Sequence, residues 1–391
     1  MAEHWASYSA LGTHRACPQK YNYAYLERLA KVDPEDVRVE LEFGLWWHAL
    51  RAADSIERGR RHGSLRWTQE FVNTVDGGPR IKIEGTENLV DAVLAAAVTW
   101  WENLHGTTQQ TWRERLGWDS LIQGLAHIDG QYRERWQTEI DNEHPVAVEL
   151  HWRRELPTLP APEGGRIDPD TVMTGYVDEV YLDTKRNLLV ARDHKTHKTL
   201  GTQSSVDDMM DSQLQVYAWG ATPTIAEWGL GPVRAVAYDR VRSMRPKTPK
   251  VTQSGTLSAS VKDFDLRTYL DWCASGPEYP GRLKDGSGAG VYEVDPNVVA
   301  HLSSEVQRSI WFQRTLTPLN PNIVQTHLRA AVDTSLDIRA TKDRARTSGE
   351  AGRNLSGACR WCDFAGLCRA QMIGGPDGEY ELADYNLVKR S

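Results

Sequence analysis

The pattern of apolar and polar residues predicts a group of β-strands in the middle of the chain. Between Val172 and Val180 the two kinds of residue alternate, which is typical of a strand with one buried face. A Thr-Lys-Arg-Asn turn follows, and the apolar run Leu188–Ala191 indicates a second, buried strand. Similar runs occupy 145–150 and 233–238. The pattern therefore predicts a mixed sheet within residues 146–240.

Helical periodicity dominates most of the remaining chain. It is found at 42–58, 87–104, 121–141, 261–275, 297–315 and 322–340, and a further helix is expected to begin near Gln213. Loops are expected near Gly77–Pro79 and over Pro157–Gly165, and a polar linker over 248–260. The predicted fold class is α/β, with a central mixed sheet flanked by helices and large helical additions. We divide the chain into an N-terminal helical segment, a helical lobe, a sheet-containing core, a second helical region and a cysteine module with a tail that has no clear element: 1–29, 30–145, 146–250, 251–345 and 346–391.

The composition is that of a soluble globular protein, with 40% hydrophobic residues and a net charge of −7 over 391 residues. The sequence has no secretory signal and no apolar run that approaches roughly 18 residues, so we expect a cytoplasmic protein without a membrane partner. The 15 tryptophans are mostly expected in the core, although aromatic side chains also stack on single-stranded nucleic acids. The sequence contains no Walker A loop and no helicase pattern, which indicates that the chain lacks a motor of its own.

Charged residues stand where the two central strands end. Asp178 closes the first strand, and Asp193 and Lys195 follow the second, two residues apart and therefore on one face. A hairpin can bring all three together at the edge of the sheet. Two carboxylates bind a hard cation such as Mg²⁺, and a neighbouring ammonium group can orient or deprotonate the attacking water. The pattern predicts a metal-dependent hydrolase site, although a single Asp here is also typical of a solvated or turn-capping residue.

Further polar residues have both a structural and a functional interpretation. Gln213 and Tyr217 are four residues apart and share one face of the expected helix, as a surface glutamine and a buried tyrosine also would. His48 lies in an amphipathic segment beside two tryptophans, where a packed core histidine is the alternative to a metal ligand. Glu149, in the strand before the hairpin, is a possible supporting residue for the site.

The cysteines form a split pattern. Cys359, Cys362 and Cys368 have the spacing C-x2-C-x5-C, and a tetrahedral metal or an iron–sulfur cluster needs a fourth thiolate. Cys17 is the best candidate for it, whereas Cys273 has the surroundings of an ordinary helix cysteine. Disulfides are not expected in a reducing cytoplasm. On spacing alone, zinc and iron–sulfur fit equally well.

In their order along the chain, these motifs resemble the PD-(D/E)xK nuclease superfamily and its RecB-like branch in particular. The matching positions are Gly44-x-x-x-His48, Gly175-x-x-Asp178, Asp193-x-Lys195 and Gln213-x-x-x-Tyr217. The split cysteines resemble the iron–sulfur staple of the AddB subunit and of small CRISPR-associated and phage exonucleases. The resemblance implies a restriction-endonuclease-like sheet and a [4Fe–4S] cluster that joins the chain ends through Cys17, Cys359, Cys362 and Cys368.

The resemblance also implies a role for each site residue. Mg²⁺ or Mn²⁺ would be bound by the side chains of Asp178, Asp193 and His48. The backbone carbonyl of His194 would be a further ligand. Lys195 would position the attacking water and stabilise charge on the phosphate. Gln213 would orient Lys195 or the water, and Tyr217 would brace its helix or touch the nucleotide. The expected function is a DNA exonuclease acting on single-stranded or duplex ends, in phage or prokaryotic recombination, replication or repair.

A basic segment follows the last predicted strand and is expected to form a loop that contacts DNA phosphates. Its cations are Arg240, Arg242, Arg245, Lys247 and Lys250, and a solvated basic loop is the alternative. Two other functions remain open. The chain could be a DNA-binding or recombination subunit that is nucleolytic only with a helicase or recombinase in trans. It could also be a zinc-stapled structural module with a vestigial site.

Overall fold

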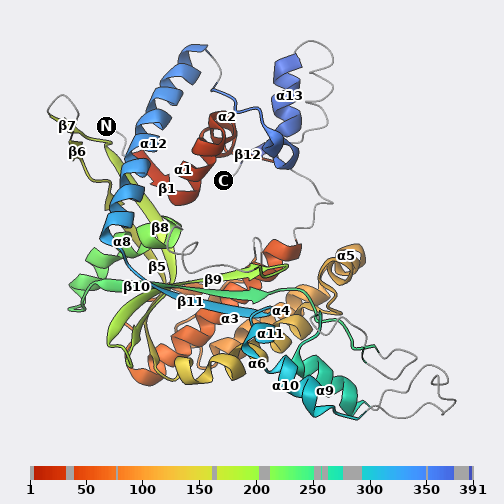
Figure 1. Cartoon of the computed structure of the whole chain (residues 1–391). Helices are drawn as coiled ribbons and strands as arrows, with labels where there is room; N and C mark the ends of the chain where they lie inside the picture. The colour runs from red at the N-terminus through yellow and green to blue at the C-terminus, as the bar shows by residue number, and fades with distance from the viewer. Residues whose placement is uncertain are drawn as a thin grey trace.

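The computed structural model of the chain describes residues 4–31, 39–75, 78–160, 165–201, 212–250, 257, 263–275, 293–348, 351–373 and 387–389. Its centre is a six-stranded mixed sheet in which β1, β8, β9, β10 and β11 are adjacent in that order and β5 also pairs with β8 (Figure 1). The bounds of these strands are β1 (His4–Ser7), β5 (Glu143–Glu155), β8 (Thr171–Asp183), β9 (Leu188–His197), β10 (Val233–Arg242) and β11 (Phe312–Pro318). The predicted mixed sheet is therefore confirmed.

The central hairpin separates part of the way along its strands. β8 and β9 pair antiparallel only from Asp183↔Leu188 to Glu179↔Arg192. Beyond that pair, β8 continues between β5 and β1, whereas β9 continues parallel to β10 as far as His197. Asp178 and Asp193 are the first residues past the last paired positions. The divergence of the two strands creates a fork with these two aspartates at its base.

Helices cover both faces of the sheet. α3 (Val39–His62) packs on one face with α4 (Leu89–Glu102), α5 (Gly106–Leu116) and α6 (Leu121–Ile140), around a core rich in tryptophan. α8 (Ser212–Glu227) packs on the other face, together with α12 (Pro321–Ser348). Trp46, Trp47, Trp112, Trp118 and Trp152 are almost completely buried. Trp101 and Trp311 are also buried, so seven of the 15 tryptophans belong to the core, whereas Trp5 and Trp361 are exposed.

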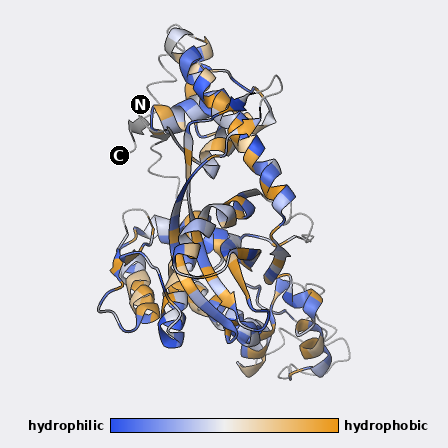
Figure 2. Cartoon of the chain, turned by 90° about the vertical axis from the view of Figure 1, so that its left-hand side faces the viewer, coloured by the Kyte–Doolittle hydropathy of each residue, from blue (hydrophilic) through white to orange (hydrophobic). Residues whose placement is uncertain are grey.

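Glycines allow α8 to approach the sheet closely. A Cβ at Gly220 would lie 2.2 Å from the ring of Trp152, and a Cβ at Gly175 would lie 3.0 Å from both Trp152 and Tyr217. Gly175 thus opens the Gly-x-x-Asp motif because the Tyr217 ring occupies the space where a side chain would stand. Apolar positions are interspersed with hydrophilic ones along the strands and helices that make these contacts (Figure 2).

Described segments near the two ends of the chain lie together, beyond one end of the sheet (Figure 1). The N-terminal part contains α1 (Tyr8–Ala16), α2 (Pro18–Tyr21), a π-helix (Asn22–Leu26) and β2 (Leu29–Lys31). The C-terminal part contains a 3₁₀ helix (Gly357–Trp361), α13 (Ala365–Ile373) and β12 (Leu387–Lys389), which pairs with β2. Asn354 Nδ2 donates to the Ala16 carbonyl at 2.9 Å, and the backbone N–H of Gln19 donates to the Gly352 carbonyl at 2.9 Å. These contacts tie the ends of the chain together.

The smaller elements complete the described part of the chain. Two two-stranded ribbons are formed, one by β3 (Phe71–Val72) with β4 (Ile81–Lys82) and one by β6 (Leu159–Pro160) with β7 (Arg166–Ile167). Three short helices lie near β11, namely α9 (Leu266–Ala274), α10 (Pro296–Leu302) and α11 (Glu305–Arg308). Among the described residues, none of the helices is both long enough and apolar enough to cross a membrane.

Several predictions of secondary structure are wrong. The helix expected at 297–315 is α10 and α11 followed by the start of β11, which pairs with β10. The segment 1–29 begins with the strand β1, the helix α5 was not expected, and the tail contains β12. The basic segment expected as a loop from residue 240 is still strand up to Arg242, because β10 pairs with β9 that far. Most of the expected linker at 248–260 and the first residues of the helix expected at 261 lie outside the described residues.

Candidate active site

The fork between β8 and β9 brings together residues from four elements. His48 of α3 places Nδ1 3.2 Å from Oδ2 of Asp178 on β8. The same carboxylate oxygen accepts a hydrogen bond from the backbone N–H of His194 on β9, at 2.8 Å. Asp178 is thereby held from both sides, by a helix and by the partner strand. Gly44, one turn before His48, allows the helix to approach β9, because a Cβ there would lie 2.9 Å from Thr196 Oγ1.

Glu149 joins this group from β5. Its strand neighbours Val148 and Leu150 pair with Glu179 and Val177, so Glu149 lies opposite Asp178. Among the described residues, ligand atoms of His48, Glu149 and Asp178 form a group close enough to hold one metal ion, all within 4.8 Å of one another. Glu149 has a backbone φ of 54°, a left-handed conformation that is costly for a residue with a side chain. The sequence indicated Glu149 only as a supporting residue.

Asp193 and Lys195 lie on the β9 side of the fork. Lys195 Nζ donates to Asp193 Oδ1 at 3.1 Å and lies 2.9 Å from Oδ2. Asp193 Oδ2 is buried and has no partner with hydrogen-bond geometry. Among the described residues, the ammonium of Lys195 is therefore the charged partner of this carboxylate, and a buried carboxylate beside other acids can also take a cation as a ligand. The side chain of Lys195 is 38% exposed, so its ammonium group remains accessible to a substrate.

The electrostatics of the fork are those of crowded carboxylates. Burial and the neighbouring charge of Asp178 raise the pKa of Asp193 to about 7 and the pKa of Glu149 to about 8. Burial alone would lower the pKa of His48, but the carboxylates of Asp178, Glu149 and Asp193 raise it to about 9. In the absence of a cation, protons on Asp193, Glu149 and His48 therefore balance the negative charge of the carboxylates. A divalent cation could replace them, because carboxylate oxygens and imidazole nitrogen are suitable ligands.

The remaining predicted residues of this site lie near Lys195. Burial raises the pKa of Tyr217 on α8, a hydrogen bond with Gln213 opposes this shift, and the charges of Asp193 and Lys195 also act on the phenol. The side chain of His194 is buried, with Nδ1 3.8 Å from Asp239 Oδ2, and its ring lies edge-to-face with that of His48, with centroids 6.4 Å apart. Its backbone N–H makes the contact with Asp178.

A buried ionic network borders the fork where α3 covers the sheet. Glu179 and Arg192, each next to a fork aspartate, form an ion pair at 2.8 Å, and Arg58 of α3 contacts Glu179 at 3.0 Å. Arg192 also contacts Glu143 and Asp239, which both bind Arg314 of β11. Sequence reasoning missed this network. Its signal was a pair of adjacent charges, Asp178-Glu179 and Arg192-Asp193, because neighbours on a strand face opposite ways. These pairs lie inside β8 and β9, so the expectation that the two strands end at Asp178 and Asp193 is wrong.

The four cysteines of the predicted cluster lie on the clasped chain ends. Cys17, Cys359, Cys362 and Cys368 are all half-buried free thiols. Burial raises the pKa of Cys362, and the charges of Cys17 and Lys20 also act on it, so Cys17 and Cys362 are neighbours despite their separation in sequence. The four sulfurs do not form a compact group of the kind found for His48, Glu149 and Asp178. Cys273 is buried in α9, in an apolar cluster, as expected of a core cysteine.

The five cations of the predicted DNA-binding segment differ in their surroundings. Arg240 is buried, at 4% exposure, and lies over the ring of Tyr238. Arg242 lies over Trp311. Arg245 and Lys247 form ion pairs with Asp119 and Asp263, at 2.7 and 2.8 Å, and Lys250 is exposed. The segment is therefore partly neutralised by its own neighbours.

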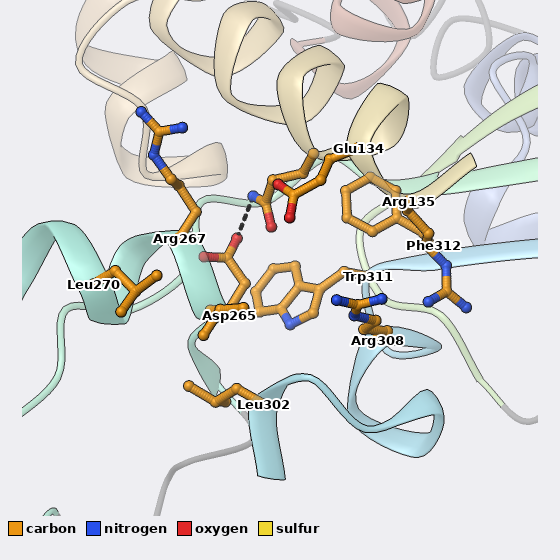
Figure 3. A pocket seen from close by; sticks show the side chains of 11 residues that line it. Glu134, Arg135, Asp265, Arg267, Leu270, Leu302, Arg308, Trp311 and Phe312 are labelled. Carbon is orange, nitrogen blue, oxygen red and sulfur yellow. Dashed lines mark hydrogen bonds between the residues drawn. The ribbon is translucent and has the colours of Figure 1, made fainter. Parts of the chain in front are cut away.

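A cavity of about 80 Å³ lies between α6, α9 and β11 (Figure 3). Asp265 accepts a hydrogen bond from Gln131 Nε2 at 2.6 Å within it, and its lining includes Arg135, Arg308 and Trp311. None of the predicted site residues lines this cavity. The cavity is therefore separate from the residues of the fork.

An open hairpin of a mixed sheet that carries carboxylates, a lysine and a helix-borne histidine is an arrangement that can hold a divalent cation. The profile of the PD-(D/E)XK nuclease superfamily matches residues 6–369, nearly the whole chain. The protein belongs to the PD-(D/E)XK nuclease superfamily, whose nucleases use divalent metals. The resemblance seen in the sequence is confirmed at this level, whereas the RecB-like branch and the iron–sulfur subtype stay predictions. No curated protein matches the sequence.

Proposed function

We propose that this protein is a metal-dependent DNA exonuclease of the RecB-like, iron–sulfur class. The observation that supports this most strongly is the meeting of Asp178, Asp193, Lys195 and His48 where β8 and β9 separate. We propose a role in prokaryotic or phage recombination, replication or repair, with a helicase or recombinase as a possible partner in trans. Action on the ends of single-stranded DNA is part of the same proposal and rests on the resemblance to the branch.

Four groups would hold the cation, namely His48, Glu149, Asp178 and Asp193, with the His194 carbonyl as a further ligand. A bound Mg²⁺ or Mn²⁺ supplies Lewis-acid stabilisation of the charge on the phosphate. Asp193 raises the pKa of Lys195 although burial opposes this, so the side chain stays an ammonium at neutral pH. Lys195 would orient the attacking water and stabilise negative charge on the phosphate. Gln213 and Tyr217 would fix the position of Lys195.

A cluster of the [4Fe–4S] type is proposed on Cys17, Cys359, Cys362 and Cys368. Supporting it are the free thiols on adjoining segments and the contacts that bring residues 16–19 against residues 352–354. A single zinc ion would need four sulfurs at about 2.3 Å from one point, a tighter grouping than these thiols form. A multi-iron cluster takes thiolates that lie farther apart, and for this reason we propose iron–sulfur in place of zinc.

The test is cleavage of end-labelled linear single-stranded DNA by anaerobically purified protein in Mg²⁺ or Mn²⁺. We expect short products from the wild type and a loss of at least about a hundredfold in rate for Lys195→Ala, because charge stabilisation of the phosphate is lost. Lys185→Ala is the matched control, since Lys185 is exposed in the turn at the other end of the same hairpin.

Each part of the proposal has its own contradicting result. Retention of the wild-type rate by Lys195→Ala would remove the proposed site. A circular strand cut as fast as its linear form would remove exonuclease action and leave an endonuclease. No cleavage by a wild-type protein that binds metal would favour the partner-dependent alternative.

A further inference from the structure

A pair of aromatic rings lies on the sheet next to the fork carboxylates. Tyr176 precedes Asp178 by two residues on β8 and therefore lies on the same face. His151 is its cross-strand partner on β5, and the two rings are stacked, with centroids 4.6 Å apart and planes at 18°. Tyr176 is nevertheless 50% exposed, whereas the tryptophans of the core are covered. One member of the pair thus presents its ring to solvent beside the site.

The ring of His151 is fixed from behind. Its Nε2 lies 2.7 Å from Oγ1 of Thr174, which also hydrogen-bonds the Trp152 carbonyl at 3.2 Å. The fixed ring holds Tyr176 in one orientation by stacking. The pair therefore forms a rigid flat surface.

The surface faces an open cavity that continues into the fork. A cavity of about 470 Å³ is lined by Tyr176, His151 and Trp67, and also by Gln69, Asn73 and Glu149. The last three also line an adjoining cavity of about 210 Å³ that contains His48 and Asp178. Asn73 Nδ2 donates to Gln69 Oε1 at 2.8 Å, and Gln69 Nε2 donates to the Glu149 carbonyl at 3.3 Å. The path from the carboxylates to the aromatic pair is therefore lined by amides and flat rings, together with the carboxylates of Glu70 and Glu149.

These features fit a nucleobase better than another ligand. Aromatic side chains that bind single-stranded nucleic acid present one face to solvent, because every base has a flat surface that can stack. A pair that served the sheet alone would gain its cross-strand contact without leaving half of Tyr176 exposed. We propose that Tyr176, backed by His151, is the stacking platform for a base of the DNA strand adjacent to the phosphate that is cleaved. This inference rests on the proposed nuclease function.

The test compares wild type, Tyr176→Ala and Tyr176→Phe on two strands, one normal and one that lacks the bases of its terminal nucleotides. On the normal strand, we expect Tyr176→Ala to raise KM about tenfold with little change in kcat, and Tyr176→Phe to resemble the wild type. On the abasic strand, all three proteins should share the raised KM. Tyr25→Ala is the matched control, because Tyr25 is an exposed tyrosine stacked on Tyr21, away from the cavity.

A binding measurement separates this inference from the nuclease function. In the Lys195→Ala background, strands carrying 2-aminopurine at successive positions should show quenching at one position, and Tyr176→Ala should abolish it. That quenching would support the platform even if no protein cleaves DNA. Equal losses by Tyr176→Ala on normal and abasic strands, or quenching that does not depend on Tyr176, would overturn it.

Discussion

At the scale of single residues, Glu149 carries two costs that its position beside Asp178 explains. Its φ of 54° is strained for a residue with a Cβ, and its carboxyl is held next to like charges. Strain and unfavourable charge at one residue are retained when the surrounding structure makes use of them. A cation between Glu149, Asp178 and His48 would relieve the charge, and the backbone strain is what aims the carboxyl into the group.

The charge cost predicts an opposite effect of Glu149→Gln on stability and on metal binding. Burial and Asp178 raise the pKa of Glu149 to about 8, above its unfolded value near 4.3, so the native state binds the extra proton between these pH values. The stability of the metal-free protein therefore falls as pH rises from about 5 to 8. Glu149→Gln should remove this part of the fall and be more stable at pH 8 in EDTA, by roughly 1–3 kcal/mol. Denaturant unfolding at pH 5 and 8 measures the difference.

The same variant should bind Mn²⁺ more weakly, because a neutral amide replaces a charged ligand. Glu155→Gln is the control, since Glu155 lies exposed on the same strand. Unchanged metal affinity in Glu149→Gln, measured by calorimetry at pH 8, would exclude Glu149 from the cation site.

At the scale of elements, the position of α8 depends on its close contact with Trp152. Gly220→Ala would place a methyl group 2.2 Å from the buried ring, so the helix or the ring must move. We expect a loss of roughly 1–3 kcal/mol in the free energy of unfolding. Because α8 carries Gln213 and Tyr217, a displaced helix should also reduce cleavage.

Gly130→Ala is the matched control for this substitution. Gly130 lies in α6 with nothing within 4 Å of its added Cβ, so helix propensity should raise stability by roughly 0.5–1 kcal/mol. Chemical denaturation of the wild type, Gly220→Ala and Gly130→Ala measures both changes in the free energy of unfolding. Equal effects of the two substitutions would show that propensity, and not the contact with Trp152, determines the outcome.

The elements that the sequence predicted are those with a local pattern. The β8–β9 hairpin joins neighbouring segments, so alternation and a turn were enough to place Asp178, Asp193 and Lys195 together. β1 and β11 are strands because they pair with β8 and β10, which lie far away in sequence, and their own residues do not indicate it. The φ of Glu149 and the burial of Arg240 are likewise products of tertiary packing, so no local pattern could reveal them.

At the scale of the whole molecule, the chain ends are held together by protein contacts around the four cysteines. Tyr23 of the N-terminal π-helix packs on Phe364, with ring centroids 5.3 Å apart, and forms a hydrogen bond to Gln371. Leu367, Cys362 and Cys368 complete this small apolar cluster. Such a cluster buries little surface, so a covalent link through a cofactor would contribute more to holding the ends than these contacts do.

The proposed cluster therefore predicts that colour and stability are lost together. A link from Cys17 to Cys359 closes a loop of 342 residues (359 − 17), for which chain entropy sets an upper limit of about 6 kcal/mol. We expect Cys359→Ala to lose iron and the broad absorption near 400 nm (about the position typical of such clusters) and to unfold roughly 2–5 kcal/mol more easily.

Cys273→Ala, which alters the cysteine outside the cluster, should keep both the iron and the colour. Wild-type protein that is colourless and contains zinc would replace iron–sulfur by zinc. Loss of colour in Cys359→Ala without loss of stability would show that the cluster is present but does not act as a staple, because closing the loop would then contribute nothing beyond the contacts around Tyr23.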